Sequence, residues 1–336
     1  MKERPNEHAG DAPYLSIIVC TRNRADKVGN CLRSAIEAAE AAADITTEII
    51  LVDNGSTDAT GDIVAAFSAR SQAVRYHLEP QTGLARARNR GIDEARGQVF
   101  AFVDDDCTFD RSFVSDLHRH WGKAEQRMLL GGRIDLGDIN DLPLTIKLDN
   151  EEQYYRTSIH PAGFIHGCNF TMSRSVFQEI GYFDPAFGVG SKLLAGEDTD
   201  YVIRAHDAGV TIRYVPDMAV AHFHGRRTRD AIRKVSAAYA TGNGALYAKY
   251  AFRCPWILRN FARDVRIALQ EIIGVRAVQD PIGLSAVREV WWNCVGAGRY
   301  MWRGIASRLW WAVPSPRGDL DAAPDRGARK STSPLR

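Results

Sequence analysis

The stretch QVFAFVDDDC, residues 98–107, decides the fold, because an apolar run leads directly into three consecutive carboxylates. The apolar residues before Asp104 fit a strand buried on both faces, as in a parallel sheet. Three adjacent like charges repel one another, so this ending adds no stability of its own. The carboxylates therefore indicate a binding site for a positively charged ligand at the end of the strand.

The residues before this stretch repeat an alternation of strand and helix. Apolar, β-branched runs at 14–20, 48–53 and 73–78 predict three further strands. Helical periodicity at 24–43 and 82–97 predicts helices between them. The alternation predicts an α/β fold with a Rossmann-like, mostly parallel sheet flanked by helices.

In such sheets, ligands bind beyond the carboxyl ends of the strands. Thr21 and Arg22 follow the first predicted strand, Asp53 ends the second, and Asp104 ends the fourth. In an extended segment, Asp104 and Asp106 point the same way and suit Mg²⁺ or Mn²⁺, often shared with phosphate oxygens. An acidic turn that caps the following helix remains the alternative on these residues alone.

Two other pairs of polar residues stand out further along the chain. His222 lies near the end of the strand-like segment MAVAHF and His224 follows it, so in an extended segment both face one side. They are either metal or phosphate contacts or an ordinary histidine pair. Glu197 and Asp198 open a predicted helix, where first-turn acids are favoured by the helix dipole. A general base on a rigid helix is the functional interpretation of the same two acids.

Composition limits the remaining choices. The 336 residues carry a formal charge of +2, but residues 226–317 hold 16 Lys/Arg against 5 Asp/Glu and six of the seven tryptophans. The six cysteines are scattered without a Cys-X-X-Cys pair, which fits a reducing cytoplasm. There is no signal-peptide pattern and no apolar run of the roughly 18–20 residues that span a bilayer. We therefore expect a cytoplasmic protein without a transmembrane helix.

Seven segments, taken in order, resemble the family 2 glycosyltransferases, inverting nucleotide-sugar enzymes with the GT-A fold. The resemblance covers about two-thirds of the chain, from Leu15 to His224. The matching segments are SIIVCTRNRADKVGNCLRSAI, IILVDNGSTDAT, GLARARNRGI, FVDDDC, GCNFTMSRSVFQEIGYFDPAFG, GEDTDYVIRA and VPDMAVAH.

The resemblance implies a role for each matching residue. The residues implied to bind the nucleotide-sugar donor are Thr21, Arg22, Asp53, Arg88, Asp104, Asp105, Gly167, Asn169 and Arg226. Of these, Asp53 would bind the base, and Gly167 and Asn169 would form a substrate-facing loop near the diphosphate or the acceptor. Those implied to hold a divalent cation, Mn²⁺ or Mg²⁺, are Asp104, Asp106, His222 and, as an alternative, His224. Asp198 is the implied catalytic base, and Glu197 is the second candidate.

The resemblance also implies a division of the chain. We expect a polar tail at 1–13, a GT-A catalytic domain at 14–228, a helical, basic, Trp-rich region at 229–314 and a disordered tail at 315–336. The Arg and Trp residues of 229–314 suit helices lying on an anionic membrane, at the inner face of the cell membrane. Packing against the catalytic domain is the alternative.

The expected reaction is metal-dependent, inverting sugar transfer to a saccharide or lipid-linked acceptor, in bacterial-type polysaccharide or glycolipid assembly. A sugar nucleotidyltransferase is a rival, although the segment CTRNRADK lacks the glycines of its phosphate loop. A non-catalytic nucleotide-sugar-binding scaffold is the second rival. A dehydrogenase is disfavoured because no Gly-X-Gly-X-X-Gly follows a strand, and no module suggests nucleic acid as a partner.

Overall fold

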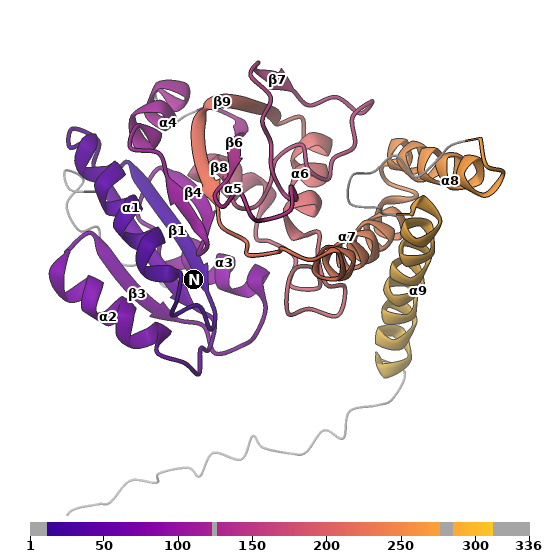
Figure 1. Cartoon of the computed structure of the whole chain (residues 1–336), viewed down its shortest axis with the longest axis horizontal. Helices are drawn as coiled ribbons and strands as arrows, with labels where there is room; N and C mark the ends of the chain where they lie inside the picture. The colour runs from indigo at the N-terminus through magenta and orange to yellow at the C-terminus, as the bar shows by residue number, and fades with distance from the viewer. Residues whose placement is uncertain (1–11, 123–125, 276–284, 312–336) are drawn as a thin grey trace, which may run out of the picture.

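The computed structural model describes residues 12–122, 126–275 and 285–311. The predicted tail at 315–336 and nearly all of the predicted tail at 1–13 lie outside these residues. Within the described chain, helices cover a nine-stranded sheet (Figure 1), which confirms the predicted α/β fold.

The sheet has the strand order β3-β2-β1-β4-β8-β6-β9-β5, and β7 pairs with β9. Strands β1, β2, β3 and β4 are parallel, as the alternation predicts. β8 is antiparallel to β4 and β6, and β6 is parallel to β9. The strands are β1 (Leu15–Thr21), β2 (Thr47–Asp53), β3 (Val74–Leu78), β4 (Val99–Asp104), β5 (Cys107–Phe109), β6 (Met128–Leu136), β7 (Gln153–Tyr154), β8 (Phe170–Ser173) and β9 (Thr211–His222).

Helices on the two faces of the sheet bury two separate cores. Successive strand residues point to opposite faces, so Ile17 and Val19 pack with α1, α2 and α4, whereas Ile18 packs with α3, α5 and α6. Burying an aliphatic side chain of this kind contributes about 1.5–3 kcal/mol. These helices are α1 (Val28–Ala41), α2 (Thr60–Arg70), α3 (Leu84–Glu94), α4 (Phe113–Trp121), α5 (Arg174–Ile180) and α6 (Glu197–Asp207).

The second half of the sheet departs from the sequence prediction. The four-residue strand β8 carries no periodicity long enough to predict it. Strand β9 runs unbroken from Thr211 to His222, into the strand-like segment MAVAHF, through a register shift between Gly132 and Arg133 of β6. Its last residues pair with β5, with Cys107 opposite His222. The chain thus brings His222 beside the acidic run, although more than a hundred residues separate them.

The C-terminal region is helical, as predicted, and extends away from β1–β3 (Figure 1). Its elements are α7 (Arg229–Tyr250), a 3₁₀ turn η1 (Pro255–Ile257), α8 (Leu258–Ile272) and α9 (Ala286–Trp311). Leu246 and Tyr247 of α7 form a third core with Phe187 and Ile203. Helix α7 therefore packs directly on the part of the chain that forms the sheet and its flanking helices.

A buried carboxylate joins α7 to α6. Asp200 of α6 is fully buried, and its Oδ1 accepts hydrogen bonds from Tyr250 (2.8 Å) and Lys249 (2.6 Å). Its Oδ2 is bonded by Arg204 at 2.9 Å. A buried charge needs such partners, so α7 completes the surroundings of the helix that begins with Glu197.

Helices α7 and α9 approach each other through glycines. A Cβ atom on Gly244 would lie 1.8 Å from the carbonyl oxygen of Asn293, and one on Gly296 would lie 1.9 Å from that of Thr241. Real Cβ atoms essentially never come so close. The small residues therefore set the contact between the two helices.

Candidate active site

The carboxyl ends of β1, β2 and β4 meet at one edge of the sheet, beside a cavity of about 580 Å³. Loops after these strands form one wall, and α6, α7 and α9 contribute to the others. Most of the predicted site residues line this cavity; they are Thr21, Arg22, Arg88, Asp104, Asp105, Asp106, Gly167, Glu197, Asp198, His222 and Arg226. Three predicted residues, Asp53, Asn169 and His224, lie behind its surface.

Asp53 is buried at the end of β2. Its carboxylate accepts hydrogen bonds from the Ser56 amide (2.8 Å) and the Tyr76 hydroxyl (3.1 Å). The next residue, Asn54, lines the cavity and was not predicted. Its side chain bonds the backbone of residues 79, 81 and 83, and so shapes the loop before α3. The sequence feature that could have identified Asn54 is its position directly after a predicted strand that ends in an acid.

The acidic run does not stay extended as expected. Strand β4 ends at Asp104, residues 105–106 form a turn, and β5 begins at Cys107. Asp104 consequently faces Arg88, with 3.3 Å between Oδ1 and Nη2, whereas Asp106 faces His222, with 3.2 Å between Oδ1 and Nε2. The two carboxylates border the same cavity but have different partners.

Asp105 lies between them and is also buried. Burial, together with the negative charge of Asp106, raises the pKa of Asp105 to about 7. The guanidinium of Arg24 lies 3.8 Å from Asp105 and 3.7 Å from Asp106. Arg24, which sequence reasoning did not select, therefore partly balances the charge of the acidic turn.

Donor atoms of Asp106, Cys107 and His222 all lie within 4.8 Å of one another. Burial alone would lower the pKa of His222, but the hydrogen bond and charge of Asp106 raise it to about 9. Burial keeps the pKa of the Cys107 thiol well above its usual value, and a protonated thiol is a poor metal ligand. The Asp106 carboxylate is a suitable ligand for Mn²⁺ or Mg²⁺. The imidazole of His222 can add a nitrogen ligand when the cation displaces its proton, so the pair fits a divalent cation whose binding releases a proton.

His224 does not join this cluster. It lies beyond the end of β9, where its Nδ1 accepts the Arg226 amide at 3.0 Å and lies 3.5 Å from Asp141. Its ring stands edge-on to that of His222, with 5.2 Å between centroids. Its Nε2 has no hydrogen-bond partner among the described residues. Of the two histidines, His222 is the one that faces Asp106.

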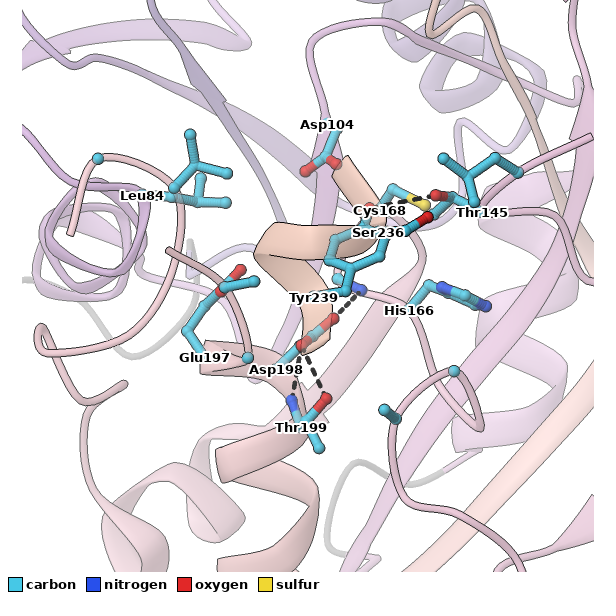
Figure 2. A pocket seen from close by; sticks show the side chains of 18 of the residues that line it. Leu84, Asp104, Thr145, His166, Cys168, Glu197, Asp198, Thr199, Ser236 and Tyr239 are labelled. Atoms are coloured by element: carbon cyan, nitrogen blue, oxygen red, sulfur yellow. Dashed lines mark hydrogen bonds between the residues drawn. The ribbon is translucent and has the colours of Figure 1, made fainter. Parts of the chain in front are cut away.

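Glu197 and Asp198 open α6 after Gly196, whose φ of 95° suits glycine. Asp198 Oδ2 accepts the Gly167 amide at 3.0 Å, and Oδ1 accepts the Thr199 amide at 2.6 Å. Figure 2 shows Asp198 beside Tyr239, with Glu197 on the other side of the helix start. Burial, followed by the charge of Asp198, raises the pKa of Glu197 to about 7.

Two residues predicted to bind the nucleotide-sugar donor, Arg88 and Asn169, form hydrogen bonds with other residues of the protein. Arg88 is 3% exposed and bonds Glu197, Asp104 and the Gly167 carbonyl. Asn169 is fully buried, and its Nδ2 donates to the carbonyls of Arg133 and Met218. Its amide thus joins the loop before β8 to β6 and β9.

The C-terminal helices supply a wall that sequence reasoning did not assign to the site. Tyr239 of α7 lines the cavity together with Asp198, and its hydroxyl is directed to Thr145 Oγ1 at 3.2 Å (Figure 2). The other lining residues from this region are Arg233, Ser236, Ala237, Ala240, Asn243, Ser285, Arg288, Glu289 and Trp292. No local motif marks them, because only the packing of α7 on α6 and of α9 on α7 brings them here.

Comparison with known families gives two overlapping matches. Residues 99–316 match the family described as Glycosyl transferase family group 2. Residues 16–181 match the one described as Glycosyl transferase family 2.

Two individual relatives each match only part of this chain. Glycosyltransferase AglE of Haloferax volcanii is 26% identical over 219 residues, which are 62% of this chain and 67% of AglE. Validoxylamine A glucosyltransferase of Streptomyces hygroscopicus is 32% identical over 122 residues, which are 35% of this chain but only 28% of that enzyme.

A solved structure resembles most of the chain. The mannosyltransferase PcManGT of Pyrobaculum calidifontis, solved with GDP-Man and Mn²⁺, has a TM-score of 0.58 and 15% identity. The match covers 88% of each chain. At this identity the likeness concerns the fold, which includes the helical C-terminal part.

Proposed function

Because the chain belongs to the family 2 glycosyltransferases, we propose that it moves a sugar from a nucleotide-diphosphate donor to an acceptor hydroxyl, with inversion. One observation carries the proposal. A single cavity is lined by a pair of candidate cation ligands, Asp106 and His222, and by a separate carboxylate, Asp198. Displacement of a diphosphate by a hydroxyl needs both a means to stabilise the leaving group and a base.

Asp106 and His222 would hold the divalent cation, Mn²⁺ or Mg²⁺, and Asp104 would contact the donor ribose and diphosphate. The bound cation would stabilise the negative charge that develops on the departing nucleoside diphosphate. Such a cofactor agrees with the Mn²⁺ bound in the structure of the Pyrobaculum mannosyltransferase, whose likeness supports the fold. Arg22 and Arg226 also line the cavity and add positive charge near the diphosphate.

Asp53, Thr21 and Asn54 form the nucleotide end of the site. Asp53 is held by Ser56 and Tyr76, so a nucleotide base would have to share this carboxylate with them. Asn54 fixes the loop that faces it. The donor therefore extends from the end of β2 towards the acidic turn.

Asp198 is the catalytic base. The acceptor oxygen forms a bond to the anomeric carbon, the bond from that carbon to the diphosphate oxygen breaks, and the hydroxyl proton moves to Asp198. The backbone amides of Gly167 and Thr199, which carry no net charge, hold the carboxylate in place by hydrogen bonds. Because attack and departure occur on opposite faces of the sugar, the product has the inverted configuration.

The test is a panel of UDP-, GDP- and dTDP-sugars with Mn²⁺, measured as release of nucleoside diphosphate. Wild-type enzyme should release the nucleotide from at least one sugar, and product NMR should show an inverted anomer. Asp198→Asn should bind the same nucleotide but turn over about 10²–10⁴-fold more slowly. Near-normal turnover by this variant would contradict the role of Asp198.

The panel, with nucleoside triphosphates and a sugar phosphate added as a further set of substrates, separates the two rival functions. A sugar nucleotidyltransferase would release pyrophosphate from a nucleoside triphosphate and a sugar phosphate. A non-catalytic scaffold would bind nucleotide sugars but release no nucleoside diphosphate. The acceptor we propose is a saccharide or a lipid-linked saccharide in polysaccharide or glycolipid assembly.

We further propose that the region 229–314 attaches to an anionic membrane surface. In α8, the apolar residues Leu258, Leu269 and Ile272 are exposed, and the same helix carries the exposed Arg259 and Arg266. Exposed apolar residues next to arginines suit the interface of an anionic bilayer. None of the helices within the described chain is long and apolar enough to cross a bilayer.

Liposomes containing anionic lipid test this attachment. Full-length protein should pellet with the liposomes, and Leu269→Ser/Ile272→Ser should weaken pelleting. Neutral liposomes should bind less, because arginine attraction to anionic headgroups is lost. Equal pelleting of the wild type and the double variant would refute a role for this face.

A further inference from the structure

Arg88 connects three segments that are distant in sequence. It lies in α3 and is 3% exposed. Its Nη1 donates to Glu197 at 2.8 Å, and its Nη2 donates to Asp104 at 3.3 Å and to the Gly167 carbonyl at 3.0 Å. The guanidinium also lies over the ring of Phe183, at 5.5 Å from its centroid.

The partners of Arg88 belong to the two opposite sides of the proposed reaction. Asp104 ends β4 on the donor side of the cavity. Glu197 directly precedes Asp198, and the Gly167 amide is bonded to Asp198 Oδ2 at 3.0 Å. The Arg88 guanidinium is therefore bonded to Asp104 on the donor side. It is also bonded to Glu197, which precedes Asp198, and to Gly167, whose amide bonds Asp198.

We infer that Arg88 is a positioning residue, which fixes the distance and orientation between the donor-side Asp104 and the base Asp198. The inference rests on the proposed function, because it assigns Asp198 as the base. It differs from the role implied by sequence resemblance, in which Arg88 binds the nucleotide itself.

The surrounding glycines support this role for a guanidinium. A Cβ atom on Gly167 would lie 2.5 Å from Arg88 Nη2, so only glycine lets the two approach. A Cβ on Gly188, whose φ is +91°, would lie 2.9 Å from Glu197 Oε2. The chain thus leaves room on both sides of the Arg88–Glu197 ion pair.

Lysine does not replace arginine here. A guanidinium presents several N–H donors in a fixed plane, whereas an ammonium is a single point charge on a flexible stem. Arg88→Lys would keep the positive charge among Asp104, Glu197 and Asp198. It would lose the geometry that bonds two carboxylates and a carbonyl at once.

The experiment compares Arg88→Lys and Gly167→Ala with wild type, using the donor found in the nucleotide-sugar panel. Gly167→Ala displaces the guanidinium without changing its charge, so it gives an independent test if Arg88→Lys fails to fold. Arg86→Ala is the matched control, because Arg86 is exposed on the same helix. Folding is checked by circular dichroism, nucleotide affinity by calorimetry with Mn²⁺, and turnover by donor consumption.

We expect kcat to fall about 10²-fold in both variants, since a misplacement of about 1 Å at a reacting group costs that much. The donor KM and the affinity for nucleoside diphosphate should stay near wild type. Arg86→Ala should match wild type in every measurement.

A rise in donor KM and a weaker nucleotide affinity, with kcat unchanged, would overturn the inference and favour direct donor binding by Arg88. Unchanged kcat, KM and affinity in a folded Arg88→Lys or Gly167→Ala variant would also overturn it. If the wild type releases no nucleoside diphosphate from any donor, the proposed function itself fails. That result is distinct, because it appears in the wild-type arm.

Discussion

Replacing Tyr250 by phenylalanine tests whether the C-terminal helices are integral to the catalytic part. Tyr250 is 3% exposed, and its hydroxyl donates to the fully buried Asp200 at 2.8 Å. The substitution removes this hydroxyl but keeps the ring, so packing in the third core is unchanged. Lys249 and Arg204 still contact Asp200 in the variant.

The expected loss follows from the charge of the acceptor. A hydrogen bond to a charged group contributes about 1.5–3 kcal/mol, and the buried carboxylate oxygen cannot replace it with water. We expect the free energy of unfolding to fall by about this amount. For domains of 150–250 residues, about 1 kcal/mol lowers the melting temperature by roughly 2–4 °C, and this longer chain should show a somewhat smaller shift.

The assay is urea unfolding followed by circular dichroism and tryptophan fluorescence, which should give one transition. Six of the seven tryptophans lie in the C-terminal third, so fluorescence mainly reports on that region. Tyr154→Phe is the control, because Tyr154 is 54% exposed on β7, and its change should stay within about 0.5 kcal/mol. If Tyr250→Phe unfolds at the same urea concentration as this control, the Tyr250–Asp200 hydrogen bond does not contribute to the coupling of α6 and α7.

Three further predictions concern packing, the cation and the cysteines. Gly296→Ala should destabilise the protein by about 1–3 kcal/mol, because the new methyl group overlaps the Thr241 carbonyl. Gly298→Ala is the control and should be neutral or stabilising, because nothing lies within 4 Å of its Cβ position. Equal melting temperatures of the two variants in thermal unfolding would show that α7 and α9 do not pack closely. Asp106→Ala should abolish the Mn²⁺ dependence of nucleoside diphosphate binding in calorimetry, and the exposed Asp44→Ala should keep it; retained dependence in Asp106→Ala would remove this residue from the cation site. Burial raises the pKa of the Cys31 and Cys107 thiols, so iodoacetamide at pH 8 should modify the exposed Cys294 first. If mass spectrometry finds Cys31 or Cys107 modified equally fast, their burial is contradicted.

The sequence by itself determined the parallel half of the sheet and the edge at which the site lies. Strands buried on both faces must be apolar along their whole length, and 14–20, 48–53 and 98–104 are such runs. Because parallel strands end on the same side, Thr21, Asp53 and Asp104 had to meet at one edge.

Local rules were less successful just beyond the strand ends. Alternation in an extended segment predicted that Asp104 and Asp106 share one direction, and likewise His222 and His224. The chain instead turns at residues 105–106, and β9 ends at His222. Period-two alternation holds only while a strand continues, so it could not indicate which carboxylate pairs with His222.

Only the tertiary structure decided what joins the parts of the site. The pairing of Cys107 with His222, the bonds of Arg88 to both sides of the cavity, and the hydrogen bond of Tyr239 to Thr145 all connect residues far apart in the chain. Such contacts depend on how packed helices and strands are oriented in space. A linear pattern encodes the burial and direction of each segment, but the neighbours of a side chain are set only when the segments pack.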